Sequence, residues 1–418
     1  MNKITRTLIA WCFYDWASAS FSIVVTTFIF STYFTTRIAE NEIIGTYQWA
    51  NATSIAGLLI AFLSPIFGAI ADHGGCHKHW LFFCTLLCVV STSLLWFAYP
   101  SHAFLLFTLT CVVLGSAACE IAQVFYNAFL PSLVPRAYIG RMSGWGWGCG
   151  YLGGILALSC CLIFFVRGEP AWLDIKQMAQ IRICGPFVGL WYLFFSLPLF
   201  LFVPRLTDKG KPISLAVRLG LKDLLSTLRR LPREKNIFLY LIAHMIYTDG
   251  LNTLFAFGGI YAAGTFKFSF QDVLLFGITM NIAAGLGAFC LAWVDDYIGS
   301  KKTILISLFF LTVLGSVLLI LQNKYVFWGV ALSLGIFVGP VQSASRTLIV
   351  RLIGSREPAA EIFGLYALSG KITAFMGPAL LGFVTLLFHS QRVGMATVML
   401  FFAVGAMLLL PVRTYTDS

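Results

Sequence analysis

The chain has 418 residues, of which 59% are hydrophobic and only 11% charged, and its mean hydropathy is +0.86. One soluble core cannot bury so much apolar side-chain surface, so the composition excludes a soluble globular protein and predicts a protein of the lipid bilayer. The formal net charge of +11 does not indicate a nucleic-acid partner, because the basic residues gather in loops between apolar stretches, as in membrane proteins.

Apolar stretches that are long enough to cross a bilayer follow one another along the whole chain. A spanning helix needs ~20 mostly apolar residues. The turn signals "YPSH" at 99–102 and "HSQR" at 389–392 divide two stretches that are too long for one span. We therefore predict an all-α polytopic membrane protein with twelve spanning helices: 8–34, 47–71, 80–99, 103–131, 142–166, 184–203, 237–263, 271–294, 303–322, 325–350, 361–388 and 393–411.

The loops between these stretches indicate how the chain is oriented and divided. Lys and Arg are concentrated in alternate loops, above all at 205–236, so the positive-inside rule places both termini in the cytoplasm. Within that segment leucines recur at helical spacing opposite basic residues, which predicts either an amphipathic helix on the inner leaflet or a plain linker helix. The predicted division is an N-terminal half (1–204), a basic linker (205–236) and a C-terminal half (237–418), each half with six spans.

A carboxylate interrupts the first span in "FYDWASASF" at 13–21, where Asp15 is followed three residues later by Ser18. The seventh span has the same arrangement, with Asp249 followed by Asn252. A charged side chain near the bilayer centre costs ~2.5 to 3.5 kcal/mol on insertion scales, so it usually faces a partner or a water-filled cavity. We predict that both aspartates flank a central cavity, although Asp15 could instead snorkel to the inner surface.

Two further charges lie inside predicted spans. Glu120 is followed at helical spacing by Gln123 and Asn127, which gives the fourth span a polar stripe. Lys371, in the eleventh span, is predicted either to pair with one of the aspartates or to contact a solute. Arg346 lies near the inner end of the tenth span and is predicted to snorkel.

Together, the predicted cavity residues suit a small zwitterionic solute. Its ammonium group would meet a carboxylate and its carboxylate would meet the lysine. Alternatively, a carboxylate in such a place could carry a proton. The expected partners are thus a small molecule, protons and the lipid bilayer, and the chain is expected to act as a monomer.

Two loops repeat each other, one after the second span and one after the eighth. The first reads "GAIADHGGCHK" and the second reads "AWVDDYIGSKK", and both contain Asp-x-x-Gly followed by cations. Their aspartates, Asp72 and Asp296, are 224 residues apart (296 − 72), close to half the chain, which indicates duplication by halves. The candidate residues of these loops are Gly68, Asp72, Gly75, Lys78, Asp296, Gly299, Lys301 and Lys302.

Glycines in the fifth and eleventh spans indicate close packing and bending. Gly140, Gly144 and Gly148 share one helical face, which favours close approach to a neighbouring helix or sliding against it. In the eleventh span Gly377 and Pro378 predict a break, because proline cannot continue the hydrogen-bond ladder.

The sequence contains no nucleophile, nucleotide-loop or metalloprotease motif, and no extramembrane segment large enough for a catalytic domain, so no enzyme and no cofactor are predicted. Most of the cysteines lie in predicted spans and are expected to be small apolar fillers. His73, Cys76, His77 and His79 share one loop, but without a second ligand cluster no metal site is predicted.

The two six-span halves with their Asp-x-x-Gly-basic loops resemble the major facilitator superfamily of secondary transporters. The resemblance implies that spans one, four, seven and ten line a central cavity and that the loops latch the halves together, each carboxylate meeting basic side chains and a helix N-terminus. The chain departs from the usual loop motif at His73, where arginine is common, at Cys76 and His77, and at Ala292, which replaces the leading glycine of the second copy.

A finer resemblance is carried by "FYDWASASF", "FYNAFLPSLVP" at 125–135, "GRMSGWGWGCGYLGG" at 140–154, "DGLNTLFAFGGIYAAG" at 249–264 and "FGLYALSGKITAFMGP" at 363–378. These strings are similar to a bacterial branch related to the fungal vacuolar effluxers that release amino acids from the autophagic vacuole, although Ser18 replaces a common asparagine. The resemblance implies a secondary transporter of the bacterial inner membrane, expected to export an amino acid or a related metabolite, and the carboxylates within the spans add the expectation of proton coupling. The alternative is a non-transporting sensor or lipid-handling protein on the same fold.

Overall fold

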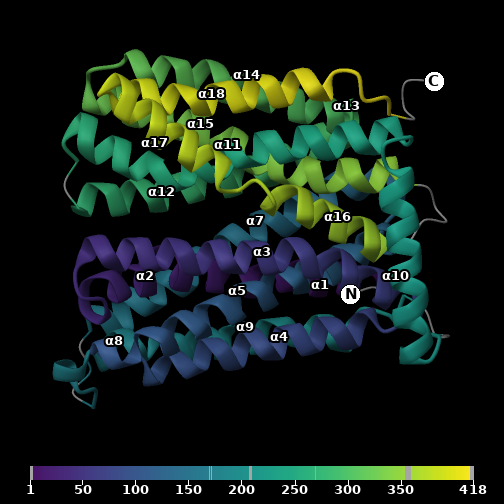
Figure 1. The fold of residues 1–418 in the computed structure, drawn as a ribbon, viewed down its shortest axis with the longest axis horizontal. Coiled ribbons are helices and arrows are strands. Elements are labelled where there is room, and N and C mark those ends of the chain that lie inside the picture. The colour runs from purple at the N-terminus through teal and green to yellow at the C-terminus, as the bar shows by residue number, and fades with distance from the viewer. Residues whose placement is uncertain are drawn as a thin grey trace.

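The computed structural model describes residues 3–168, 170, 172–206, 210–268, 270–353 and 359–414. Long helices run side by side through the molecule and form two groups, one purple to blue and the other green to yellow (Figure 1). One shorter helix, α10 (Ile213–Arg230), lies across the ends of the long helices, at the end of the molecule where the N-terminus also lies (Figure 1). We call this end the α10 end and the opposite one the far end.

The first group consists of the helices that precede α10. Its first helical segment runs without a break from Lys3 to Ile38 and contains two π-helical stretches, Phe21–Phe28 and Phe34–Ile38. Such wide turns inside α-helices frequently occur at functional sites. The α-helices of this group are α1 (Lys3–Ser20), α2 (Ile29–Tyr33), α3 (Glu42–Gly74), α4 (His77–Leu94), α5 (Leu105–Ala128), α6 (Leu130–Leu133), α7 (Ile139–Cys160), α8 (Ala179–Arg182) and α9 (Cys184–Phe202).

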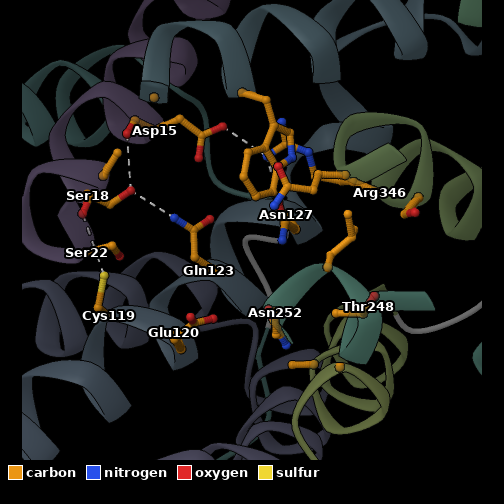
Figure 2. Close-up of a pocket in the computed structure, with 18 of the residues that line it drawn as sticks. Asp15, Ser18, Ser22, Cys119, Glu120, Gln123, Asn127, Thr248, Asn252 and Arg346 are labelled. Atoms are coloured by element: carbon orange, nitrogen blue, oxygen red, sulfur yellow. Dashed lines mark hydrogen bonds and ion pairs between the residues drawn. The ribbon is translucent and has the colours of Figure 1, made fainter. Parts of the chain in front are cut away.

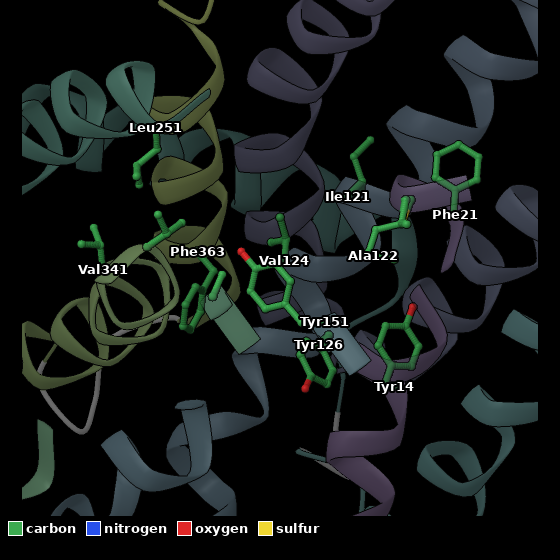
Figure 3. Packing of buried hydrophobic residues seen from close by; sticks show 14 of the residues in the cluster. Tyr14, Phe21, Ile121, Ala122, Val124, Tyr126, Tyr151, Leu251, Val341 and Phe363 are labelled. Atoms are coloured by element: carbon green, nitrogen blue, oxygen red, sulfur yellow. The ribbon is translucent and has the colours of Figure 1, made fainter. Parts of the chain in front are cut away.

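The second group follows α10 and is built in a similar way. Its α-helices are α11 (Lys235–Phe266), α12 (Phe270–Cys290), α13 (Ala292–Ile298), α14 (Ser300–Ile320), α15 (Lys324–Leu352), α16 (Ala359–Lys371), α17 (Met376–Phe388) and α18 (Gln391–Leu409). Buried aromatic and aliphatic side chains of both groups pack between the helices, as Tyr14 and Phe21 do in the first and Leu251 and Val341 in the second (Figure 3).

Among the described residues, 11 helices are long and apolar enough to cross a membrane, so the protein is a multi-pass membrane protein. Twelve spans were predicted from the sequence. The helix missing from the 11 is α11, which is long enough but contains His244, Asp249 and Asn252, and these polar residues lower its hydropathy. The boundaries of the predicted first span were too narrow, because helical structure continues from Lys3 to Ile38.

The predicted break in the eleventh span is present but lies a few residues earlier. α16 ends at Lys371 and α17 begins at Met376, so the chain turns just before Gly377 and Pro378. The position has a physical reason: Pro378 has no N–H to donate to the carbonyl of residue 374, and its ring would clash with that carbonyl in a continuous helix. Proline is tolerated near the start of α17, where helical N–H groups have no partners within the helix.

Glycines allow the two helix groups to meet closely near the α10 end. A side chain at Gly144 of α7 would collide with Ala288 of α12 and Ala292 of α13, and one at Gly148 would press on Phe289. On the other side of the molecule, a side chain at Gly68 of α3 would collide with the backbone of Ala360 in α16. The predicted glycine face of α7 therefore lies against the other group, as a close-packing interpretation requires.

Candidate functional site

A cavity of about 390 Å³, with several polar and charged side chains in its wall, lies between the two helix groups. This volume is within the range of pockets that hold small molecules. Its walls come from α1, α5 and α7 of the first group and from α11, α12, α15 and α16 of the second. Seven of the eight predicted cavity residues line it: Asp15, Ser18, Glu120, Gln123, Asn127, Asn252 and Lys371.

Asp15 forms a buried ion pair with Arg346 of the other helix group, with 3.0 Å between its Oδ2 and the arginine Nη1 (Figure 2). Arg346 also donates to Asn127 Oδ1 at 3.2 Å, to Ser143 Oγ at 2.9 Å and to the Ser143 carbonyl at 2.7 Å. Its guanidinium lies over the Trp11 ring, 4.9 Å from the centroid. The arginine is thus fully engaged by protein groups, which is how a buried charge is tolerated.

This geometry corrects the prediction for Arg346, which was expected to snorkel to the inner surface. The side chain is only 3% exposed and points inward, because its partners Asp15, Asn127 and Ser143 lie on helices of the first group. The inward position of Arg346 could have been predicted from the sequence. Like the other charges inside the spans, a cation in a span that lines a cavity needs a partner of opposite charge.

A second ion pair crosses the cavity between Glu120 of α5 and Lys371 of α16, with 2.8 Å between Oε1 and Nζ. Both side chains remain accessible, with 40% of Glu120 and 29% of Lys371 exposed. Of the two alternatives predicted for Lys371, the ion pair with an aspartate is wrong, and contact with a solute stays a prediction. Glu120 of α5 faces α16, whereas Asp15 is paired with Arg346 and Asp249 lies on the side of α11 that faces α17.

Asp249 is not among the residues that line the cavity. Its Oδ2 instead accepts a hydrogen bond from the Gly377 amide at 3.1 Å, so the carboxylate caps the N-terminus of α17. Gly377 permits this approach, since a side chain there would collide with Thr253 of α11. The expectation that Asp15 and Asp249 flank the cavity together is therefore wrong, and only Asn252 of the second motif reaches it.

Amide and hydroxyl groups complete the polar lining. Gln123 donates from Nε2 to Ser18 Oγ at 2.9 Å, which links α5 to α1 (Figure 2). Sequence reasoning missed His244, which lines the cavity from α11, stacks on Tyr366 with 4.1 Å between ring centroids, and hydrogen-bonds through Nδ1 to Ser369 Oγ at 2.8 Å. His244 could have been predicted from the sequence, because it lies eight residues before Asn252 on the same helix and therefore on a similar helical face.

The first repeated loop joins the two helix groups through Asp72. Its Oδ2 accepts from the Glu361 amide at 2.8 Å and its Oδ1 from the Ala360 amide at 3.3 Å, at the N-terminus of α16. His77 Nε2 lies 2.7 Å from the same carboxylate. Lys78 does not cross between the groups but donates to the Val203 carbonyl at 2.6 Å.

The second repeated loop has the same geometry in the opposite direction. Asp296 accepts from the amides of Gly140 and Arg141, at 2.8 Å and 3.2 Å, at the N-terminus of α7. The Arg141 side chain adds a bond at 3.0 Å, and Arg351 lies 3.5 Å away. Each carboxylate thus meets the positive end of a helix dipole in the other group.

The remaining loop residues shape these contacts without taking part in them. Gly75 and Gly299 have positive φ angles of 61° and 92°, which glycine adopts without strain. Lys301 donates to the Leu410 carbonyl at 2.8 Å and so holds its own helix group together. Lys302 is exposed.

Comparisons with known proteins agree with this geometry. The solved proton:xylose symporter XylE superposes with a TM-score of 0.78 at 13% identity, covering 98% of this chain and 96% of XylE. The E. coli fucose:proton symporter FucP gives a TM-score of 0.72 at 14% identity over 98% of this chain and 99% of FucP. An MFS-type transporter of Bacillus subtilis, YxiO, is 26% identical over 100% of this chain and 97% of YxiO. These likenesses show that the chain has the major facilitator fold.

The family is more specific than the fold. A family model described as "Vacuole effluxer Atg22 like" matches residues 49–416. Autophagy-related protein 22-1 of Phaeosphaeria nodorum is 25% identical over 82% of this chain and 72% of the fungal protein. The chain belongs to the Atg22-like effluxer family of the major facilitator superfamily.

Proposed function

We propose that the protein exports a small zwitterionic solute of the amino-acid class by alternating access, coupled to protons, across a bacterial inner membrane. The observation that carries the solute class is the accessible pair of Glu120 and Lys371, one charge from each helix group, 2.8 Å apart at the cavity wall. A zwitterion can replace each partner of this pair with a group of its own, so that neither side chain loses its opposite charge.

In this proposal the two halves, 1–204 and 237–418, rock about the cavity on either side of the linker 205–236, and both termini and the α10 end face the cytoplasm. The concentration of basic residues near that end supports the orientation. The Asp72 and Asp296 contacts act as latches that hold the α10 end closed. A second cavity of about 390 Å³, lined by Phe276 and Phe327 among others, adjoins the first through Ile23 and Asn281, which supports an opening toward the far end.

The amino-acid part of the proposal also draws on the relationship to the effluxer family, and the proton part on the proton symporters that share the fold. The monomer is proposed because the described cavity is complete within one chain.

The test is counterflow of radiolabelled amino acids in proteoliposomes, preceded by a thermal-shift screen, since a ligand of the folded state raises its stability. We expect at least one neutral amino acid to stabilise the protein and to exchange. Glu120→Gln and Lys371→Met are each expected to reduce exchange at least about tenfold, the effect of ~1.4 kcal/mol of lost binding.

A matched control lies outside the cavity. Lys324 and Asp272 form another accessible pair, 2.7 Å apart, and neither residue lines the cavity. Lys324→Met is therefore expected to leave exchange unchanged. Equal losses in Lys324→Met and Lys371→Met, or stabilisation only by anionic or uncharged solutes, would rule out the zwitterion site.

A further inference from the structure

The helix α10 has three different faces, and only one of them is used inside the protein. Ala216, Gly220 and Leu224 recur every four residues and are buried. They pack on α3, since a side chain at Gly220 would collide with the backbone of Ala69. This face fixes α10 to the first helix group.

The second face of α10 is apolar and uncovered. Val217, Leu221, Leu225 and Leu228 recur at helical spacing beside the buried face, and the three leucines are 44%, 52% and 43% exposed. Single exposed leucines need no explanation, but a continuous stripe on one helix marks a surface that meets another apolar phase.

The third face is basic. Arg218, Lys222 and Arg229 are all exposed and lie next to the leucine stripe, at positions i, i+4 and i+11. Figure 1 shows α10 lying across the long helices, so its axis runs along the plane of the membrane surface when those helices cross the bilayer. A helix in this plane that has apolar and basic faces side by side fits the boundary between acyl chains and headgroups.

We propose that the uncovered surface of α10 binds anionic phospholipid headgroups. The leucine stripe lies at the acyl boundary, and Arg218, Lys222 and Arg229 contact lipid phosphates. Charge complementarity selects this partner, because three neighbouring cations attract an anionic leaflet, each basic residue contributing a factor of about five in binding. An acidic protein would satisfy the cations, but it would not explain an apolar stripe at the level of the membrane surface.

The binding also has a consequence for the neighbouring loop. Asp223 of α10 lies 2.9 Å from His73 Nε2 of α3, and the amide of Lys211, just before α10, donates to the His73 carbonyl at 3.1 Å. Lipid that holds α10 in place therefore also holds the end of α3, where Asp72 contacts α16.

The test measures hydrogen–deuterium exchange of the full protein in nanodiscs of pure phosphatidylcholine and in nanodiscs that also contain phosphatidylglycerol. We expect amides of 213–230 to exchange several-fold more slowly with the anionic lipid. Because the attraction is electrostatic, 1 M salt, with a Debye length of about 3 Å, should remove the difference. Equal exchange in both lipids would overturn the proposal.

Two variants separate the lipid surface from general charge and from packing. Substitution of Arg218, Lys222 and Arg229 together by glutamine should abolish the difference between the two lipids. The matched control replaces three exposed arginines outside α10 by glutamine, Arg205, Arg233 and Arg413, and should preserve it. Loss of the difference in the control as well would mean that net charge, and not the α10 surface, attracts the lipid. None of these six residues is buried, so both variants should fold.

Discussion

The two ion pairs that join the helix groups at the cavity differ in how the protein surrounds them. The Asp15–Arg346 pair is nearly enclosed, and its arginine makes three further hydrogen bonds and lies against Trp11. The Glu120–Lys371 pair has one contact between accessible side chains. The first pair cannot be opened without leaving charges buried, whereas water or a solute can replace either partner of the second. The comparison shows that a charged side chain inside a membrane span can either stabilise the fold or bind a solute. The number of other protein contacts that the ion pair makes distinguishes these two roles.

The largest effect is expected for Arg346→Met, which leaves Asp15 as an uncompensated buried charge. Breaking a buried pair from one side typically costs about 3 to 5 kcal/mol of unfolding free energy. The measurement is chemical unfolding of the purified protein in detergent. The double variant Asp15→Asn with Arg346→Met should be more stable than Arg346→Met alone, because it removes the unpaired charge as well. If Arg346→Met unfolds like the wild type, the enclosed pair is not structural.

Exchanging the charges of the accessible pair, with Glu120→Lys and Lys371→Glu in one protein, sharpens the contrast. The reversed pair should form again, so the unfolding free energy should change by less than ~1 kcal/mol, as for exposed ion pairs. A bound zwitterion would have to turn around, so counterflow should remain at least about tenfold below wild type. Wild-type exchange in the swapped protein would contradict a direct contact between this pair and the solute.

The two loop aspartates, Asp72 and Asp296, also differ in the number of protein groups around each carboxylate. Asp296 has two arginines near it, whereas Asp72 has His77 and the same kind of helix N-terminus. Asp296→Asn should therefore lower the unfolding free energy by about 2 kcal/mol, the value of a hydrogen bond to a charged group, and Asp72→Asn by less. Thermal unfolding checks the order, with Asp174→Asn in an exposed loop as the control. The reverse order would mean that the histidine, not the arginines, makes the stronger contact.

The sequence predicted which residues are special in this membrane protein better than it predicted their partners. Asp15, Glu120 and Lys371 were found because charges in apolar stretches are rare and costly. Their pairing could not be predicted, because it depends on how each helix is rotated about its axis in the bundle. Arg346 was misassigned because a cation four residues from the predicted end of its span (350) can reach the membrane surface, whereas its actual partners, Asp15 and Asn127, lie on other helices.

The repeat between Asp15 and Asp249 shows the same limit. The two motifs have the same spacing, but α11 turns Thr248, Leu251 and Asn252 toward the cavity and leaves Asp249 on its other side. Sequence spacing gives the angle between residues of one helix, not the direction of the helix face. For the two repeated loops, the sequence itself specified the glycine turns, and the family resemblance implied the contacts with helix N-termini in the other group.

The smallest effect is expected at Asp249, which shares its sequence pattern with Asp15 but not its surroundings. Asp249→Asn keeps an oxygen that can accept from the Gly377 amide, so counterflow and its pH dependence should stay within about twofold of wild type, less than ~1.4 kcal/mol in binding. Asp249→Ala removes the cap of α17 and should cost about 1 kcal/mol of stability, a typical value for a lost helix cap. Thermal unfolding and counterflow at several pH values measure both effects. A loss of pH dependence in Asp249→Asn would show that this carboxylate, although outside the cavity wall, carries the coupled proton.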